Sequence, residues 1–406
     1  MATRKLYHED SAILETDATL LRQEEADGTW AVVLDRTVLF PGGGGQPADA
    51  GWIDDQEVTG FAGEADELVH YLAAPLQGRS PGDTVRVRVE PRRRRESAQQ
   101  HTGQHIVSAC LLEVGGYQTV SVHMGDDALT VESPVPTIPD DALRAVEECV
   151  NRTIGMNLPV RTHVVSGEEL ARFNLRRAAS PRELHRVVEI EGRDASACGG
   201  VHVSRTGEVG LAKCLGSEKI RGNCRTIWLV GDRAYRDYAQ KTELARALVG
   251  ELSAPAGEIL DMVKRLRTEA SELRERLEAM EIQAAAGEAG SLVGAGERWP
   301  GGILVIRRSE GASRTAFRAV GLELARRSGV VALLANVEAG TAQLFACRGA
   351  EMKVDLPALL KPHLPLVRGK GGGREGVWQG SAQEVGQLDE FLEAAGAALR
   401  AACGGS

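Results

Sequence analysis

Two pairs of side chains in this sequence have the types and the spacing of metal ligands. His101 and His105 lie four residues apart in a segment with a helical pattern, so both imidazoles project from one face of the helix, about one turn apart. Cys198 and His202 form a second pair, and the two glycines between them let the chain fold tightly enough for both side chains to reach one ion. Three imidazoles and one thiolate are a donor set that suits zinc. The pattern predicts one Zn²⁺ per chain, bound by these four residues.

The residues around the predicted ligands argue against two common kinds of zinc enzyme. Zinc peptidases of the His-Glu-x-x-His class need a glutamate beside the first histidine as general base, whereas Thr102 stands at that position. Zinc deaminases need His-x-Glu and Pro-Cys-x-x-Cys, and the sequence has neither. Four protein ligands close a tetrahedral zinc site, which is typical of structural zinc unless substrate displaces one ligand. The sequence leaves these two alternatives open.

The composition is that of a folded protein with more than one domain. The chain has 406 residues, of which 43% are hydrophobic and 26% charged, and this length favours two to three domains. No run of 18 apolar residues is present and the first residues include acidic side chains, so we expect neither a membrane span nor a secretory signal. The seven cysteines, an odd number, indicate thiols or metal ligands in a reducing compartment. We therefore expect a cytoplasmic protein without membrane contact.

The apolar periodicity predicts an α+β or α/β protein of several domains. Residues 1–90 have the short alternating runs of a β-rich, barrel-like unit, interrupted by a Gly-rich loop. Residues 91–238 are expected to form an α/β domain that contains the zinc site, with a ligand helix that begins at Glu96 and ends at Gly115. The remaining elements predicted in this domain are strands at 128–132, 160–165, 185–190 and 225–230 and an amphipathic helix at 140–155.

The second half of the chain divides into a helical linker and a further α/β domain. Residues 239–290 contain two predicted helices that separate at Ser253, and the second has apolar residues at alternating steps of four and three. This coiled-coil seam fits an antiparallel hairpin or a homodimer equally well; its residues are Ile259, Val263, Leu266, Ala270, Leu273, Leu277 and Met280. After a flexible stretch at 287–296, residues 291–406 predict a strand, a helix and two strands, then a Gly-rich loop at 369–374 and a last helix.

Five spaced motifs together resemble one known family. They are FPGGGGQPADAG, HTGQH, TVSVHMG, SACGGVHV and KIRGNCR, in this order within residues 1–238. The same motifs occur in the alanyl-tRNA editing proteins, which are freestanding relatives of the editing domain of alanyl-tRNA synthetase. Residues 291–406 are similar to the DHH-associated C-terminal domain that follows this editing domain in the synthetase and in long editing proteins.

The resemblance implies a trans-editing hydrolase. Its reaction is cleavage of the ester that joins serine or glycine to alanine tRNA, with the four predicted zinc ligands in the matching positions. By the same resemblance Gly43, Gly44 and Gln46 line the substrate pocket, and Thr119 occupies the position of a threonine hydroxyl that selects serine. A hydrophobic site for alanine rejects serine only weakly, because serine differs by one added hydroxyl. A second site that hydrogen-bonds this hydroxyl supplies the missing discrimination. Asp194, four residues before Cys198, either orients a ligand imidazole or caps a turn.

Basic residues predict where tRNA binds, although the net charge of the whole chain is −9. Arg92, Arg93, Arg94 and Arg95 come directly before the predicted ligand helix and could contact phosphates near the acceptor end. Lys370 and Arg374 in the C-terminal Gly-rich loop could do the same, since such loops also form anion-binding nests. Both groups are also compatible with solvated charged surfaces or plain turns.

Three other functions stay open at the level of sequence. A non-catalytic tRNA-binding protein with structural zinc would keep every ligand and every basic residue, and a hydrolase of a different aminoacyl ester would keep the site. A phosphodiesterase of the DHH class is disfavoured because the Asp-His-His motif is missing. The sequence identifies no general base and does not decide between serine and glycine.

Overall fold

Alternating apolar side chains in the first part of the chain close a six-stranded barrel. In the computed structural model, which describes residues 2–63, 67–374 and 376–404, Val85, Val87 and Val89 are buried while the residues between them are exposed or half-buried. The barrel confirms the predicted β-rich unit, and its strands follow the order β2-β3-β7-β6-β5-β8. Their bounds are β2 (Glu15–Ala26), β3 (Thr29–Leu34), β5 (Gly51–Ile53), β6 (Gln56–Ala62), β7 (Val69–Leu72) and β8 (Thr84–Val89).

A tight Gly-rich turn leaves the barrel after strand β4 (Arg36–Thr37), which pairs in parallel with β1 (Arg4–Lys5) beside the short helix α1 (Leu6–Glu9). All four residues of Gly42–Gly45 have a positive φ, a conformation that side chains with a Cβ adopt only with strain. Two backbone hydrogen bonds, of 2.9 and 3.1 Å, join Gly43 to Gln46. The turn therefore fixes the position of Gln46 at the end of the loop.

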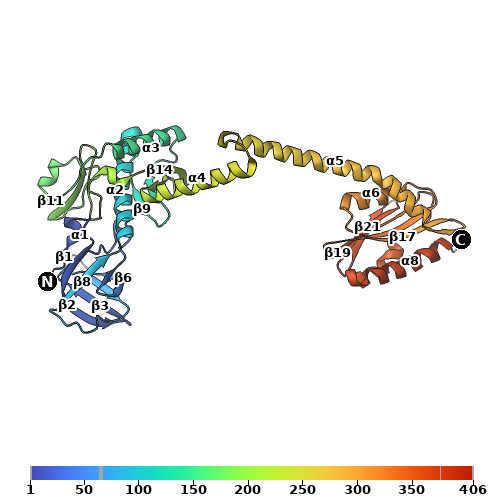
Figure 1. Cartoon of the computed structure of the whole chain (residues 1–406), viewed down its shortest axis with the longest axis horizontal. Helices are drawn as coiled ribbons and strands as arrows, with labels where there is room; N and C mark the ends of the chain where they lie inside the picture. The colour runs from blue at the N-terminus through green and yellow to red at the C-terminus, as the bar shows by residue number, and fades with distance from the viewer. Residues whose placement is uncertain (1, 64–66, 375, 405–406) are drawn as a thin grey trace. The chain divides into compact units, whose positions relative to one another are not determined.

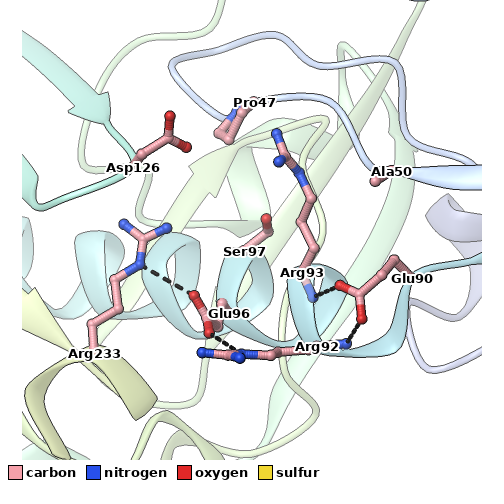
Figure 2. A pocket seen from close by; sticks show the side chains of 9 residues that line it. All are labelled: Pro47, Ala50, Glu90, Arg92, Arg93, Glu96, Ser97, Asp126 and Arg233. Carbon is pink, nitrogen blue, oxygen red and sulfur yellow. Dashed lines mark hydrogen bonds and ion pairs between the residues drawn. The ribbon is translucent and has the colours of Figure 1, made fainter. Parts of the chain in front are cut away.

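The ligand helix α2 (Pro91–Gly115) begins five residues earlier than the sequence pattern predicts. The carboxylate of Glu90 accepts hydrogen bonds from the backbone N–H groups of Arg92 and Arg93, as an N-cap does, and Pro91 occupies the first helical position (Figure 2). The arginine run is thus the first turn of the helix and not a segment before it. At the other end Gly116 adopts the left-handed conformation and ends the helix as predicted.

Two antiparallel sheets complete the N-terminal unit around α2. The first has the order β14-β15-β10-β9 and the second β11-β12-β13, and α3 packs against α2 (Figure 1). Helix α3 has the predicted bounds, and the four predicted strands are present within two residues of their expected ends. The bounds are α3 (Asp140–Gly155), β9 (Ser121–Met124), β10 (Leu129–Ser133), β11 (Val160–Ser166), β12 (Leu184–Ile190), β13 (Asp194–Ala197), β14 (Ala212–Ile220), β15 (Asn223–Val230) and the 3₁₀ turns η1 (Glu169–Arg172) and η2 (Thr206–Val209).

Two long helices follow, separated at Ser253 as predicted. They are α4 (Asp232–Leu252) and α5 (Ile259–Gly294), with η3 (Ala256–Glu258) between them, and the chain divides into two compact units, Met1–Ala247 and Leu248–Ser406. The stretch at 287–296, expected to be flexible, is helical as far as Gly294. Ala285 and Ala289 are buried in the core formed with the following domain, and this packing stabilises the helix despite its glycines.

The C-terminal unit is a six-stranded sheet with helices. The predicted sequence of strand, helix, strand and strand is present as β17 (Gly302–Glu310), α6 (Arg314–Ala325), β18 (Val330–Glu338) and β19 (Thr341–Arg348). The strand order of this sheet is β16-β17-β18-β19-β21-β20. Its described strands pair antiparallel with their neighbours, except that β17 and β18 are parallel. The other elements are β16 (Glu297–Trp299), α7 (Leu356–Leu360), η4 (Lys361–Val367), β20 (Lys370–Arg374), β21 (Val377–Ala382), η5 (Val385–Gln387) and α8 (Leu388–Gly404).

The predicted C-terminal Gly-rich loop is an edge strand. Lys370–Arg374 forms β20, which pairs with β21 along its whole length, so the backbone groups that face β21 are used in the sheet and are not offered to an anion. Glycine is needed at two of its positions, because an added Cβ would come 2.2 Å from a Trp378 ring atom at Gly371 and 2.0 Å from the carbonyl oxygen of Val377 at Gly373. Within the described part of the chain, none of the helices has the length and apolar character of a membrane span.

Candidate metal centre

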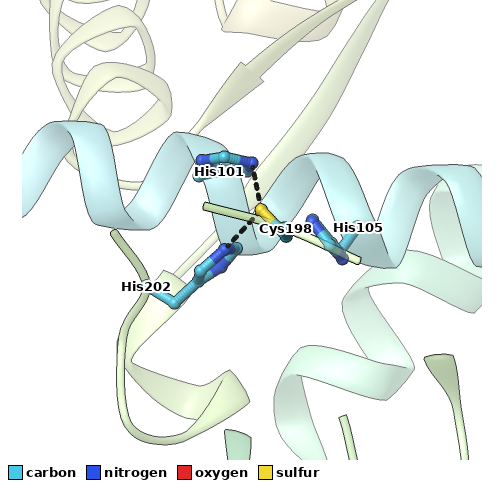
Figure 3. Close-up of side chains that lie close together, drawn as sticks. All are labelled: His101, His105, Cys198 and His202. Atoms are coloured by element: carbon cyan, nitrogen blue, oxygen red, sulfur yellow. Dashed lines mark hydrogen bonds between the residues drawn. The ribbon is translucent and has the colours of Figure 1, made fainter. Parts of the chain in front are cut away.

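Two segments far apart in the sequence bring the four predicted ligands together. His101 and His105 lie on one face of α2, and Cys198 and His202 belong to the loop that follows β13 (Figure 3). Sγ of Cys198 lies 3.3 Å from Nε2 of His101 and 3.3 Å from Nε2 of His202. One nitrogen or sulfur atom from each of the four residues lies within 4.8 Å of the others, and the three histidines are buried. The cluster has the ligand types and the proximity to hold one metal ion.

The loop reaches the helix because Gly200 has no side chain. A Cβ atom at this position would lie 2.1 Å from Cε1 of His101, so only glycine fits at position 200. Arg186 on β12 holds the loop in place, since its Nη1 atom donates to the carbonyl oxygens of Cys198 at 2.8 Å and of Gly200 at 3.0 Å. The glycines and the arginine together determine where the thiol lies.

Each imidazole has its Nδ1 atom hydrogen-bonded to another buried side chain. The three contacts are Gln46 Oε1 to His101 at 2.6 Å, Thr102 Oγ1 to His202 at 3.1 Å and Asp194 Oδ2 to His105 at 2.9 Å. Such partners fix the orientation of a ring and leave its Nε2 atom for a metal ion. For Asp194, this contact agrees with the role of orienting an imidazole and not with a turn cap.

The electrostatics of the cluster favour a thiolate among imidazoles. Burial opposes ionisation of Cys198, but the neighbouring His101 and His202 hold the pKa of its thiol well below the usual range. Burial lowers the pKa of His202 to about 3. Burial also opposes protonation of His105, yet hydrogen bonds to Asp194 and Cys198 raise its pKa to about 9. A metal ion at this cluster would therefore displace a proton from His105.

Relatives of the chain bear on what this cluster does. Residues 185–225 match the family described as threonyl and alanyl tRNA synthetase second additional domain. The alanyl-tRNA editing protein Aarsd1 of Mus musculus is 31% identical over 384 residues, which cover 93% of this chain and 90% of that protein. The chain belongs to the alanyl-tRNA editing protein family. The Aarsd1 protein of Rattus norvegicus is 30% identical over the same coverage.

The editing family is also related to a synthetase. The alanine–tRNA ligase of Methanothrix thermoacetophila is 29% identical over 423 aligned residues, which cover 98% of this chain but 45% of the ligase. The chain thus matches less than half of that ligase. The likeness runs through both compact units of the chain and is not limited to the segment with the four predicted ligands.

Two of the residues predicted for the site lie beside the ligands: Gln46, which the family resemblance assigns to the pocket, and Asp194, which its position before Cys198 indicates. Gln46 is buried, and its Oε1 atom accepts a second hydrogen bond from the backbone N–H of Val201 at 3.1 Å. Its Nε2 atom is buried without a hydrogen-bond partner among the described residues. Gly43 and Gly44 are exposed at the tip of the turn, and an added Cβ on either would meet nothing within 4 Å.

Thr119 lies between α2 and β9 in this editing-family chain. Its hydroxyl donates to Oγ of Ser108 at 2.9 Å, and Ser108 lies three residues beyond His105 on α2. The strand that follows contacts the Gly-rich turn, because Met124 N–H donates to the carbonyl oxygen of Gly45 at 2.9 Å. The segment that carries Thr119 therefore joins the turn to the ligand helix.

The arginine run divides into one buried and three exposed residues. Arg94 is 3% exposed and forms an ion pair with the buried Asp49, and it also donates to the carbonyl oxygens of Ser11 and Val38. Arg94 thus joins the barrel to α2, in contrast to the tRNA contact predicted for it. The sequence does not reveal this role because Asp49 lies 45 residues away.

The exposed arginines border a pocket of about 360 Å³ at the start of α2 (Figure 2). Arg92, Arg93 and Arg233 line it, together with Pro47, which follows Gln46, and Ser97, which precedes His101 by one helical turn. Arg92 is paired with Glu96 at 3.1 Å, and Arg95, outside the pocket lining, is paired with Asp232 at 3.3 Å. Nε of Arg93 donates to the carbonyl oxygen of Ala48 at 3.1 Å.

A second pocket, lined by more basic than acidic side chains, lies in the C-terminal unit. Lys370 and Arg374 are exposed at the two ends of β20. Arg374 lines a pocket of about 400 Å³ together with Arg348 and Lys353. Lys370 is not among the residues that line this pocket. The structure thus adds two basic residues to the predicted pair.

Sequence reasoning missed two residues that shape the metal centre. In the sequence, Thr102 indicates only that the glutamate of zinc peptidases is missing. In the structure its hydroxyl hydrogen-bonds to Nδ1 of His202 and accepts a hydrogen bond from Val203 N–H at 3.2 Å. The sequence does not indicate a role for Arg186, because it lies in a strand with an ordinary apolar pattern. The position of Thr102 next to His101 is the only signal that could have pointed to its role.

Proposed function

We propose that this protein is a zinc-dependent deacylase that hydrolyses serine or glycine from mischarged alanine tRNA. The observation that carries the proposal is the convergence of three imidazoles, each oriented through its Nδ1 atom, on the Cys198 sulfur in a member of the alanyl-tRNA editing family. The bound zinc ion would polarise the ester or the attacking water. His101, His105, Cys198 and His202 are the proposed ligands of one ion per chain.

The protein groups around the ligands would orient the aminoacyl ester. Gln46 has a buried N–H group that finds no partner among the residues the structure describes, and an unpaired buried donor costs about 1 to 3 kcal/mol. A carbonyl oxygen of the substrate would satisfy this donor. Thr119 donates its own proton to Ser108, so its hydroxyl oxygen is free to accept a hydrogen bond from the hydroxyl of serine. Gly43 and Gly44 would contribute to the pocket indirectly, because they form the tight turn that positions Gln46.

The exposed arginines would bind the acceptor end of the tRNA. The pocket lined by Arg92 and Arg93 lies one helical turn from His101, within reach of phosphates next to the terminal adenosine. Arg95 would add a further positive charge beside this pocket, whose lining also includes Glu90, Glu96 and Asp126. Residues 291–406, proposed as a DHH-associated tRNA-binding domain, would contact a second part of the tRNA through Lys370 and Arg374. Two separate contacts in one chain would make binding bivalent.

The decisive experiment measures deacylation of Ser-, Gly- and Ala-charged alanine tRNA by the wild-type chain and by the Cys198→Ala variant. We expect release of serine or glycine, slow release of alanine, and loss of both activities in the variant. Cys214→Ala is the matched control, because Cys214 lies in the same unit but outside the cluster. Elemental analysis of the same samples should give one zinc per wild-type chain and much less in Cys198→Ala.

A non-catalytic tRNA-binding protein with structural zinc is the second candidate. It is favoured by the fact that four protein ligands already close a tetrahedral zinc site. This candidate predicts one zinc per chain and tRNA binding without release of any amino acid. Hydrolysis of mischarged alanine tRNA at a rate that depends on Cys198 would rule it out.

A further inference from the structure

A second pair of sulfur atoms lies in the N-terminal unit, outside the four predicted zinc ligands. Cys110 on α2 and Cys149 on α3 meet where the two helices pack, with their Sγ atoms 2.7 Å apart. Cys110 is fully buried and Cys149 is 8% exposed. A disulfide has an S–S length of about 2.05 Å, so a small movement of the two side chains would join them.

The surroundings of this pair favour oxidation over metal binding. Glu113 and the two cysteines have the ligand types and proximity of a metal site. However, Nη2 of Arg193 lies 2.7 Å from Glu113, 3.3 Å from Cys149 and 3.9 Å from Cys110, so a positive charge already contacts all three ligand atoms. It would repel a metal cation. A guanidinium beside a thiol instead stabilises the thiolate, which is the form that attacks an oxidant.

We propose that Cys110 and Cys149 form a reversible disulfide when the protein meets hydrogen peroxide. The Cys149 thiolate attacks one oxygen of the peroxide, the O–O bond breaks, and a sulfenic acid and hydroxide form; the hydroxide takes up the proton that Cys149 released and becomes water. Sγ of Cys110 then attacks the sulfenic sulfur, and the hydroxyl leaves as a second water with the Cys110 proton. Two thiols and one peroxide give one disulfide and two waters. A dithiol reductant reverses the change.

The two sulfurs have different roles because their surroundings differ. Cys149 is the more exposed of the pair and lies closer to Arg193, so it meets the oxidant first. Burial raises the pKa of the Cys110 thiol to about 12, so this residue stays protonated until the sulfenic acid forms beside it. The partly exposed side chains of Arg193 and Glu113 border the pair on its solvent side.

The disulfide would link the helix that carries His101 and His105 to its neighbour α3. The two cysteines are 39 residues apart in the sequence, and a cross-link of this span restricts the unfolded chain. We expect it to raise the midpoint of thermal unfolding of the N-terminal unit by about 5 to 10 °C. This consequence is independent of the proposed editing activity.

Mass spectrometry of the full-length chain tests the proposal directly. The protein is treated with hydrogen peroxide, remaining thiols are blocked with N-ethylmaleimide, and the digest is searched for linked peptides. We expect most molecules to contain a Cys110–Cys149 linkage. Dithiothreitol should remove this linkage, and the Cys214→Ser control should form it to the same extent. In Cys110→Ser, the Cys149 sulfenic acid should accumulate and react with dimedone.

Three results would overturn the proposal. Maleimide labelling of both thiols after a peroxide treatment that oxidises Cys214 would mean that the pair does not react. Conversion of Cys149 to a sulfinic acid in the wild-type chain would mean that Cys110 does not reach it. A second bound metal per chain that is lost in Cys149→Ser would assign the cluster to metal binding. The first two measurements use the unmodified sequence, so they do not depend on the folding of a variant.

Discussion

Oδ2 of Asp194 lies 2.9 Å from Nδ1 of His105, and Oδ1 of the same carboxylate accepts a hydrogen bond from Nε of Arg176 at 2.8 Å. Both oxygens of Asp194 thus face donors. In Asp194→Asn, one of these donors would face an amide N–H₂ group. We expect zinc affinity to fall by about 10- to 100-fold, because the orientation of His105 is lost.

Competition with a coloured chelator measures the affinity of Asp194→Asn. Glu189→Gln is a matched control, since Glu189 contacts His163 at 3.0 Å on the neighbouring strands, outside the ligand cluster. Equal affinities of the Asp194 and Glu189 variants would show that Asp194 does not orient the ligand.

Thr119→Val should reduce the preference for serine. The valine keeps the shape of threonine but offers no oxygen to the hydroxyl of a seryl ester, so we expect the ratio of Ser-tRNA to Ala-tRNA hydrolysis to fall by about 5- to 100-fold. Single-turnover deacylation of the two tRNAs gives this ratio. Thr119→Ser keeps the hydroxyl and should restore most of the preference. An unchanged ratio in Thr119→Val would make the residue a packing residue only.

Each of the two pairs of proposed ligands could be recognised in the sequence because its signals are local. The spacing of His101 and His105 places both on one face of a helix, and the glycines before His202 allow the close turn that the structure contains. The same holds for α3, whose amphipathic pattern and acidic first turn predict its bounds. Periodicity and caps determine such elements without reference to the rest of the chain.

Other features depend on contacts between distant residues, which periodicity does not reveal. The burial of Arg94 requires Asp49, and the helical conformation of Gly287–Gly294 requires packing of Ala285 and Ala289 against α6. The strand at Lys370–Arg374 likewise requires β21 as its partner, although its own composition predicts a loop. In each case tertiary packing outweighs the local preference of the residues.

Replacing both Lys370 and Arg374 by glutamine should weaken tRNA binding without changing the saturated rate of deacylation. Each lost phosphate contact lowers the slope of log affinity against log salt by about one, so we expect a decrease of up to about two. Filter binding over a range of salt concentrations gives the slope. Arg22→Gln with Arg86→Gln removes the same charge from the barrel and serves as control. The same loss in both double variants would mean a general charge effect.

The seam of α5 should hold two copies of the chain together. Leu266, Leu273, Leu277 and Met280 are exposed, so the C-terminal unit does not cover them. Leu273→Glu with Leu277→Glu should convert a dimer into a monomer in sedimentation velocity experiments. Leu260→Glu changes an exposed leucine outside the seam and should leave the dimer intact. A monomeric wild-type chain would favour the hairpin alternative.

His70 should make the barrel less stable in acid. Burial lowers the pKa of this imidazole from 6.5 to about 4 in the folded barrel. Between these values the unfolded chain binds more protons, so the free energy of unfolding falls as pH drops, by about 2 kcal/mol from pH 7 to 5. Urea unfolding at pH 7 and at pH 5 measures this change in the free energy of unfolding. Hydrogen-exchange labelling of β3, always carried out at the same pH, reports the unfolding of the barrel. His70→Gln keeps a polar group but does not titrate, so its loss of stability over the same range should be smaller.

The distance between the two ligand pairs along the chain determines when the metal centre can form during protein synthesis. Ninety-seven residues separate His101 from Cys198, which at about 5 to 20 residues per second corresponds to about 5 to 20 seconds of translation. The barrel, α2 and α3 all leave the ribosome within or before this interval. A nascent chain therefore presents His101 and His105 before Cys198 and His202 have been added, and capture of the proposed metal ion would be a late step in the folding of the N-terminal unit.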